Sequence, residues 1–215
     1  MDKVQVFCDG SGLKGGIGAA AVVMTPPEGP HLQYLLGKDT AHTVLESELV
    51  GILLVLQLLP RYPSARMALI ALDNQAAIVA LTNRPSQPGQ YLVNTIHDQL
   101  LRRSQPCMRV HVEWTLGHTK VRGNERADTL ARAAAEGAHS PLNDLPRILL
   151  RRLPTSIAAL KANQRRKLVP VWAKKWKASP RHMKMSHIDP TLPSHKTYRM
   201  IFDWPRQDTS IIMQL

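Results

Sequence analysis

The chain has 215 residues, of which 44% are hydrophobic, so it can bury a substantial core. Its two cysteines, Cys8 and Cys107, are too few for a disulfide framework or a cysteine zinc site. Residues 49–60 form the longest apolar run, which is too short to span a membrane, and the N-terminus lacks a signal-peptide pattern. We therefore expect an intracellular protein, cytoplasmic or nuclear, without a membrane partner.

Positive charge is concentrated in the last third of the chain. Residues 1–137 carry 13 Lys and Arg against 12 Asp and Glu, whereas residues 138–215 carry 15 against 4. We expect a globular domain over residues 1–138 and a basic C-terminal extension over 139–215, partly helical or disordered. An excess of positive charge favours a polyanionic partner, most simply nucleic acid.

Three short apolar segments, punctuated by glycine and proline, open the chain. They predict strands over residues 4–8, 17–24 and 31–37, with a proline-rich turn over residues 25–30. Short strands in this succession indicate an antiparallel meander. The next segment, residues 43–59, predicts a long helix that ends at Pro60 and Pro63.

The following residues alternate between strand and helix patterns. Strands are predicted over residues 66–72 and 107–116, and helices over residues 74–82, 91–103 and 124–136. A meander followed by this alternation predicts an α/β fold, with a mixed five-stranded sheet flanked by helices. In the extension, residues 155–179 are expected to be helical but broken at Pro170.

Two aspartates come just after predicted strands. Asp9 ends the apolar run before GSG, and Asp73 ends ALIAL. Taken singly, Asp9 fits a turn and Asp73 fits a helix N-cap. Taken together, both lie at the sheet edge where ligands gather in α/β proteins.

The long helix offers two further acids, Glu46 and Glu48. At 100° per residue, Glu46 lies near Gln57 on the polar side, whereas Glu48 lies inside an apolar arc. A buried carboxylate is unfavourable unless it is paired or bound to metal. We therefore expect Glu46 to be a solvated surface acid and Glu48 to be either a functional residue or part of an ion pair at the core edge.

The closing segment, GHTKVRGNERAD, adds one more acid and a histidine. Asn124 and Asp128 are four residues apart and share a helix face, and His118 lies in the loop before them. A surface acid and a loop histidine without a role remain alternatives. Four converging carboxylates would suit Mg²⁺, which prefers oxygen ligands, and His118 could transfer a proton.

Four motifs of the sequence together resemble those of a known family. FCDGSG, the SEL of LESELVGILL, LDNQAAI and GHTKVRGNERADTLARAAAE occur in the order and rough spacing of type 1 ribonuclease H. The resemblance covers about residues 3–137, and GHxxxxGNExAD is its most specific pattern. The chain is most similar to the ribonuclease H domain of non-LTR retrotransposon polyproteins, in particular fungal ones. Unlike many cellular members, it has no asparagine in the HTVLES segment before the helix glutamate and no basic protrusion.

This resemblance implies a metal-dependent endonuclease that cleaves the RNA strand of RNA–DNA hybrids by a two-metal-ion mechanism. It implies two Mg²⁺ ions, with Mn²⁺ as a substitute, and a reverse transcriptase partner in a parent polyprotein. The implied metal-binding catalytic acids are Asp9, Glu48, Asp73 and Asp128. His118 is the implied catalytic loop histidine.

Substrate contacts are implied in the same way. Gly10, Ser11 and Gln75 would contact the RNA strand near the cut, and Asn124 would position the closing helix. In the extension, the segment QRRKLVPVWAKKWK mixes basic residues with Trp172 and Trp176. This segment could contact nucleic acid, or it could form a plain amphipathic helix that packs on the domain.

Three other interpretations stand beside this one. GSGLKG at residues 10–15 fits a dinucleotide-binding pattern, but a strand rather than a helix is predicted to follow it. An integrase-like or resolvase-like nuclease would also cluster acids, but the GNERAD helix and its histidine loop argue against it. A catalytically inactive nucleic-acid-binding remnant of a retroelement polyprotein is the main alternative.

Overall fold

The computed structural model describes residues 2–24, 29–82, 88–102, 108–115 and 121–186, together with residues 205, 207 and 208. The chain divides into two compact units, Met1–Ala162 and Asn163–Leu215, and each is described by itself.

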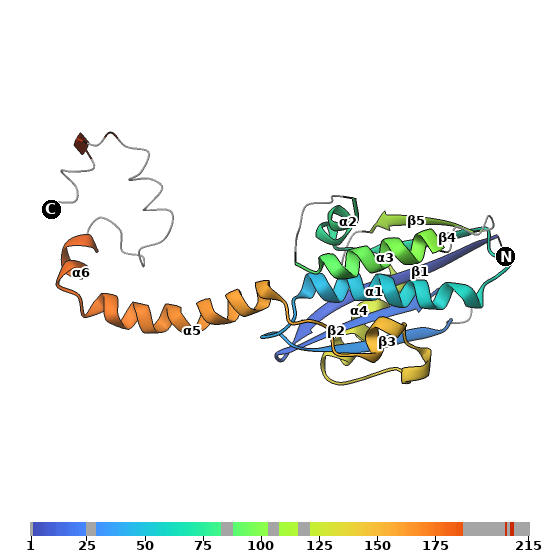
Figure 1. The fold of residues 1–215 in the computed structure, drawn as a ribbon, viewed down its shortest axis with the longest axis horizontal. Helices are drawn as coiled ribbons and strands as arrows, with labels where there is room; N and C mark the ends of the chain where they lie inside the picture. Colours follow the sequence, from blue (N-terminus) through green and yellow to red (C-terminus); the bar gives the residue numbers. More distant parts are fainter. Residues whose placement is uncertain are drawn as a thin grey trace. The chain divides into compact units, whose positions relative to one another are not determined.

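A five-stranded mixed sheet forms the centre of the first unit (Figure 1). Its strands are β1 (Lys3–Leu13), β2 (Gly16–Val23), β3 (His31–Lys38), β4 (Met67–Leu72) and β5 (Arg109–Trp114), in the order β3-β2-β1-β4-β5. β1, β2 and β3 pair antiparallel, whereas β4 is parallel to both β1 and β5. The predicted fold class, a meander followed by parallel strands with flanking helices, is confirmed.

The first strand is longer than the sequence pattern predicts. β1 continues through Gly10 and Gly12 and pairs with β2 up to Leu13. The chain then reverses at Lys14 and Gly15, which both have positive φ values, of 50° and 83°. Asp9 therefore lies inside a strand, just beyond the stretch of β1 that pairs with β4.

Helices cover both faces of the sheet. α1 (Val44–Leu58), which continues into the turn η1 (Leu59–Arg61), packs against β1 and β2 together with Val4, Val6 and Cys8. α4 (Arg122–Ala135) packs against β1, β2 and β3, in a cluster that contains Phe7. Because alternate residues of a strand point to opposite faces, the two helices lie on opposite sides of the sheet.

Two shorter helices complete the α1 side. α2 (Gln75–Thr82) and α3 (Gln90–Arg102) both contact α1, and α2 also contacts β5. The four helices predicted for the domain are therefore present within one or two residues of the predicted ends. The predicted turn over residues 25–30 falls largely outside the described residues, because only its last two residues are described.

Residues after the closing helix also belong to the first unit. They contain two short turns, η2 (Leu142–Asp144) and η3 (Arg147–Leu150), and place Leu145, Leu149 and Leu153 in the main core. At the edge strand β3, the Gln33 N–H donates to Ser140 Oγ over 2.8 Å, and the Ser140 N–H donates to the Gln33 carbonyl over 3.0 Å. This compact unit thus extends past the predicted boundary at residue 138.

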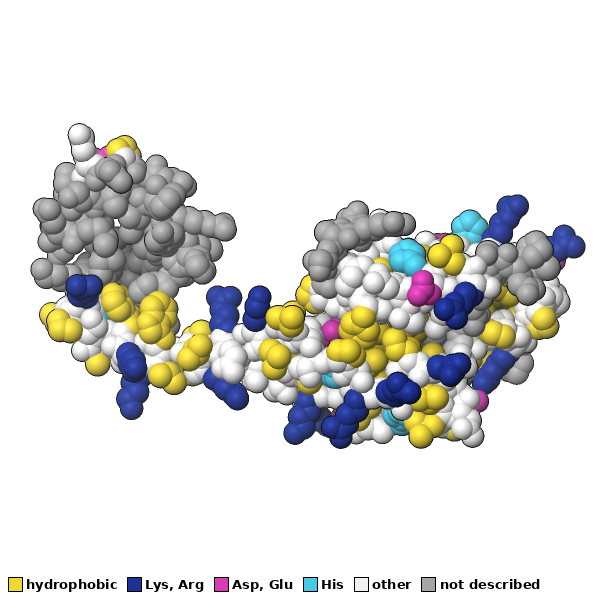
Figure 2. All heavy atoms as spheres, viewed as in Figure 1, with side chains coloured by type: hydrophobic (Ala, Val, Ile, Leu, Met, Phe, Trp, Pro, Cys, Tyr) yellow, Lys and Arg dark blue, Asp and Glu magenta, His cyan; other side chains and the backbone are white. Residues whose placement is uncertain are grey.

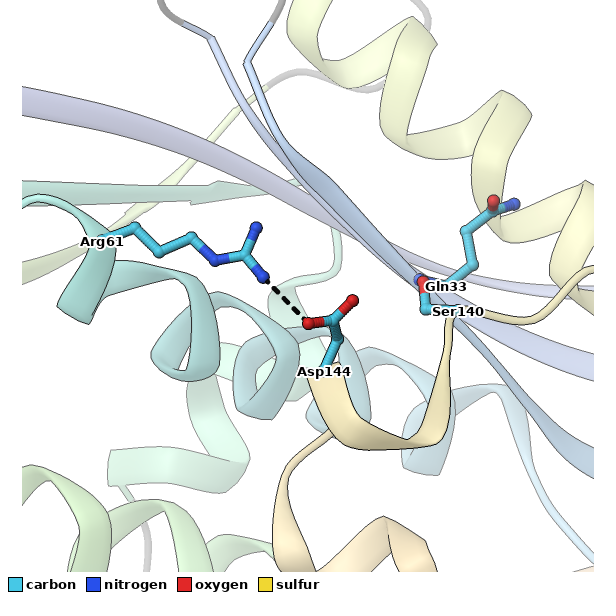
Figure 3. A network of polar contacts seen from close by, with 4 residues as sticks. All are labelled: Gln33, Arg61, Ser140 and Asp144. Carbon is cyan, nitrogen blue, oxygen red and sulfur yellow. Dashed lines mark hydrogen bonds and ion pairs between the residues drawn. The ribbon is translucent and has the colours of Figure 1, made fainter.

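An ion pair joins the same segment to the end of η1. Arg61, just after α1, places its guanidinium 3.3 Å from the carboxylate of Asp144 in η2 (Figure 3). Both side chains are 45% exposed, so the pair adds little to the stability of the fold.

Two further helices follow, α5 (Ile157–Lys177) and α6 (Pro180–Met185). The predicted break at Pro170 is wrong, because α5 runs through it. A proline inside a helix removes one N–H donor and its ring clashes with the carbonyl four residues earlier, which can bend a helix without ending it. Of the helices that the structure describes, none has the length and apolar character needed to cross a membrane.

Candidate active site

Three acidic side chains from three elements meet at one edge of the sheet. Asp9 comes from β1, Asp73 directly follows β4, and Glu48 comes from the second turn of α1. Carboxylate oxygens of the three lie within 4.8 Å of one another. A cleft of about 450 Å³ opens over them, although Asp9 is only 7% exposed and Glu48 only 3%.

A glycine brings α1 close enough to deliver Glu48. A Cβ atom on Gly10 would overlap the Ser47 hydroxyl oxygen and the Glu48 backbone nitrogen. A larger residue next to Asp9 would therefore push α1 away from β1. Gly10 thus has a packing role between β1 and α1. It also lines the cleft with Ser11, where the substrate contact is expected.

The opposite wall of the cleft is formed by α4. A Cβ atom on Gly123 would overlap the Phe7 ring, so glycine lets the first turn of α4 lie against the sheet. The next residue, Asn124, is 4% exposed, and its Nδ2 donates to Asp73 Oδ2 over 3.2 Å. One turn later, Asp128 faces the same cleft, with its Oδ1 2.9 Å from Arg132 Nε.

Asn74 has two roles in the site. Its Oδ1 accepts the backbone N–H of Ala77 at the start of α2, and its Nδ2 donates to Glu48 Oε1, each over 3.2 Å. Because Asn74 caps the helix, Asp73 is not needed as the N-cap. The Asp73 carbonyl is in turn held by Trp114 Nε1 over 3.0 Å, which fixes the turn that carries the acid.

Burial and mutual repulsion disfavour the charged forms of two of these acids. Burial, followed by the charges of Asp73 and Asp128, raises the pKa of Asp9 to about 7. Burial and the charge of Asp9 raise the pKa of Glu48 to about 9, although the Asn74 donor lowers it. The cluster is therefore electrostatically unfavourable without a cation among the acids.

A profile of the RNase H family matches residues 1–136. The chain belongs to the RNase H family. A search of curated proteins found no match. Members of this family are nucleases that bind RNA–DNA hybrids and use divalent metal ions.

Two solved RNase H structures are similar to this chain. The N-terminal RNase H domain of Rv2228c from Mycobacterium tuberculosis, solved as a fusion with maltose-binding protein, has 21% identity and a TM-score of 0.50, covering 63% of this chain and 95% of that chain. RNase H1 from the halophilic archaeon Halobacterium salinarum NRC-1 has 18% identity and a TM-score of 0.44, covering 63% of this chain and 99% of that chain. At 21% identity, the similarity to the Rv2228c domain bears on the fold alone.

Most of the predicted site residues lie in or around the cleft. Asp9, Glu48 and Asp73 form the close cluster, and Gly10, Ser11, Asn124 and Asp128 also line the cleft. Gln75 is exposed at the start of α2 and is not among the lining residues. His118 lies outside the described residues. The sequence argument missed the role of Asn74, although an asparagine at a helix start is a recognisable capping signal.

The expectation for Glu46 is wrong. Glu46 is 1% exposed, because its Oε2 accepts the Thr43 N–H over 2.8 Å while Thr43 Oγ1 accepts the Glu46 N–H over 3.3 Å. This reciprocal capping box buries the carboxylate at the start of α1. Glu46 therefore has a structural role at the helix terminus and does not join the cluster.

The donor set of the cleft suits a divalent cation. All of the clustered ligand atoms are carboxylate oxygens, which Mg²⁺ prefers. Glu48 Oε1 is held by Asn74, whereas Oε2 is buried without a hydrogen-bond partner in the part of the chain that the structure describes. A cation between Asp9, Glu48 and Asp73 would satisfy that oxygen and offset the repulsion among the acids.

Glu48→Gln should stabilise the metal-free protein at high pH. The folded-state pKa of Glu48 lies above its ordinary value of 4.5, so the folded protein retains a proton that the unfolded chain has released. Stability should therefore fall as pH rises from about 4.5 to 9 in the wild type, and less steeply in Glu48→Gln. A gain of about 1 kcal/mol at pH 9 would raise Tm by about 2–4 °C.

Thermal unfolding in EDTA at several pH values from 5 to 9 would check this expectation. Glu113→Gln removes an acid that is exposed on β5, and it should follow the wild type. An equal pH dependence in the wild type and Glu48→Gln would contradict the expected coupling.

Proposed function

We propose that the protein is a ribonuclease H that cleaves the RNA strand of RNA–DNA hybrids with two Mg²⁺ ions, for which Mn²⁺ can substitute. The observation that carries the proposal is the convergence of Asp9, Glu48 and Asp73 within 4.8 Å, in a cleft that Asp128 also lines. The position of these acids at the edge of an RNase H sheet supports hydrolysis of a phosphodiester.

The cleft residues would have two roles, metal binding and orientation of the metal-binding acids. Asp9, Glu48 and Asp73 would hold the first cation, and Asp128 would complete the site for a second. Bound cations would supply activation of the attacking water and stabilisation of the leaving oxygen. Asn74 and Asn124 orient Glu48 and Asp73 through their amide donors.

Substrate would lie across the cleft mouth. Gly10 and Ser11 line it and are placed to contact the RNA strand, whose 2′-hydroxyls distinguish it from DNA. Gln75, exposed beside Asp73, would contact the same strand from the α2 side. We assign proton transfer to His118 because of its position in the GHTKVRGNERAD motif.

The basic extension would add affinity for nucleic acid. α5 contains seven Lys and Arg residues and no acidic residue, and Figure 2 shows these side chains on more than one side of it. Contacts of this kind are made to phosphates and weaken with salt. Trp172, which is 48% exposed, could stack on an unpaired base.

We also infer a retroelement origin, with a reverse transcriptase as the partner in a parent polyprotein. The inference rests on the order and style of the motifs, and on a PGQYLVN helix start typical of retrotransposon members. An enzyme of this type would meet its hybrids inside the cell, in the cytoplasm or the nucleus. Reverse-transcriptase sequence in the same reading frame of the genomic locus would support this origin, and an isolated gene without element remnants would count against it.

Cleavage of a labelled RNA–DNA hybrid in Mg²⁺ tests the activity. The full chain should cut the RNA strand of the hybrid, lose activity in EDTA, and leave single-stranded and double-stranded RNA intact. Residues 1–162, the first compact unit, should retain the chemistry but bind hybrid more weakly and with a smaller salt dependence. A folded protein that binds hybrid without cutting it would be the inactive remnant instead.

A further inference from the structure

One basic side chain lies among the acids of the cleft. Arg132, one turn after Asp128 on α4, places its Nε 2.9 Å from Asp128 Oδ1. Of the described residues that line the cleft, it is the one with a cationic side chain, beside five acids, Asp9, Glu48, Asp73, Glu125 and Asp128. Its side chain is 53% exposed, whereas that of Asp128 is 27% exposed, so solvent reaches the pair.

Asp128 pairs with Arg132 and lies outside the close group of acids. Among the described residues, the close group of carboxylates contains Asp9, Glu48 and Asp73 but not Asp128. Asp128 is nevertheless near enough to raise the pKa of Asp9, whereas Arg132 lowers it. The acid and the base on α4 therefore act on the same cluster in opposite directions.

We propose that Arg132 competes with the second divalent cation for Asp128 and thereby sets the metal concentration at which that cation binds. The proposal rests on the proposed function, because it assumes that the cleft binds two cations. The first cation has its ligands already assembled in the cluster of three. The second must displace a guanidinium from its ligand.

The Asp128–Arg132 pair is suited to such displacement. An exposed ion pair four residues apart on a helix is weak and is screened by salt, so a doubly charged ion can compete with it. The guanidinium also remains near the cleft after displacement and repels the cation. Both effects lower the affinity of the second cation more than that of the first.

Calorimetric titration of Mg²⁺ into the full chain without nucleic acid tests this role, with Mn²⁺ titration followed by electron paramagnetic resonance as a second probe. Arg132→Met keeps most of the aliphatic stem and removes the charge. It should raise the affinity of the second cation about three- to tenfold and that of the first less than twofold. Arg132→Lys keeps the charge and should remain near the wild type.

Two matched variants separate competition from other effects. Arg126→Met removes an equal charge from the same helix at a position that is not among the cleft-lining residues, and it should change neither affinity by more than about twofold. In Asp128→Asn, the ligand that Arg132 pairs with is lost, so adding Arg132→Met should produce a smaller gain, limited to the loss of charge repulsion.

The outcomes distinguish a failure of the Arg132 competition from a failure of the proposed ribonuclease H function. If Arg132→Met lowers Tm but leaves both Mg²⁺ affinities unchanged, the pair is only structural and the competition is refuted. An equal gain in Arg126→Met, or a full gain in the Asp128→Asn background, would refute it as well. Absence of cation binding in every variant, together with no hybrid cleavage by the wild type, would refute the proposed function instead.

Discussion

Asp73→Asn should abolish hybrid cleavage while leaving the fold intact. The substitution exchanges one carboxylate oxygen of the cluster for an amide and removes the negative charge that a cation needs there. The asparagine carbonyl can still accept the Asn124 Nδ2 bond, and the Trp114 bond to the backbone carbonyl is unaffected. We expect at least about a thousandfold loss of kcat, equivalent to about 4 kcal/mol of barrier.

The metal-free stability of the same variant should not fall. The charge of Asp73 helps to raise the pKa of the buried Asp9, so a neutral side chain removes repulsion from the cluster. The Tm of Asp73→Asn in EDTA should therefore equal or exceed that of the wild type, and Mg²⁺ should stabilise the variant less. A loss of activity accompanied by a large fall in Tm would indicate a structural role.

Glu113→Gln provides the control for this experiment. It removes the same charge from an exposed position on β5, outside the cleft, and should cleave hybrid within about twofold of the wild type. If Asp73→Asn cleaved hybrid as fast as this control in Mg²⁺, the assignment of Asp73 as a metal ligand would fail.

The pairing of Asp9 with Asp73 could be predicted because it follows from sheet topology. Both acids come at the ends of apolar runs, and the carboxyl ends of parallel strands meet at one edge. Glu48 could be predicted from helical periodicity, since an acid on an apolar arc needs a partner. These arguments use only local patterns, and local patterns are what a sequence displays directly.

Glu46 shows where the same periodicity argument fails. The helical wheel places Glu46 on the polar side, but it treats the helix as if it had no ends. Near its N-terminus, free backbone N–H groups attract a carboxylate, and Thr43 three residues earlier completes a capping box. The T-x-x-E spacing was visible in the sequence and would have corrected the prediction.

The roles of Asn74 and Arg132 depend on distances that no local pattern supplies. Asn74 contacts Glu48 across 26 residues, and this contact exists only because α1 and α2 are adjacent in the fold. Arg132 and Asp128 have ordinary helical spacing, so their pair looks like any surface ion pair in the sequence. Its meaning comes from the cleft that both residues line.

The end of the first compact unit also depends on contacts between residues that are distant in the sequence. The change in charge after residue 137 suggested a separate extension, and prolines masked the spacing of Leu145, Leu149 and Leu153. In the fold these leucines are 4%, 2% and 8% exposed, and they pack into the main core. Composition therefore marked where the basic segment begins, whereas the end of the core depends on contacts with distant elements.

Ending the chain at residue 138 should strongly destabilise the domain, whereas ending it at residue 162 should not. The shorter form loses three buried leucines, each contributing about 1.5–3 kcal/mol, as an upper estimate. It also frees the β3 edge at Gln33 and the Ala41 carbonyl, which accepts the Ser156 N–H over 2.8 Å. The sum is comparable to the whole stability of a typical domain, about 5–15 kcal/mol.

Urea unfolding of three forms would measure this effect: the full chain, residues 1–162 and residues 1–138. We expect the first two to unfold with similar midpoints and the third to be largely unfolded or aggregated at 25 °C. Within the full chain, Leu149→Ala should cost about 2–5 kcal/mol, because its side chain is 2% exposed in the core. Asp144→Ala breaks the exposed pair with Arg61 and should cost less than about 1 kcal/mol.

The two point variants keep the prediction testable even if residues 1–138 cannot be purified. If Leu149→Ala were as mild as Asp144→Ala, the leucine segment would be a surface attachment and not part of the core. A stable, cooperatively unfolding 1–138 form would lead to the same conclusion and restore the boundary that the charge pattern suggests. The expected result would instead make residues 139–162 part of the smallest unit in which the acids of the cleft are held together.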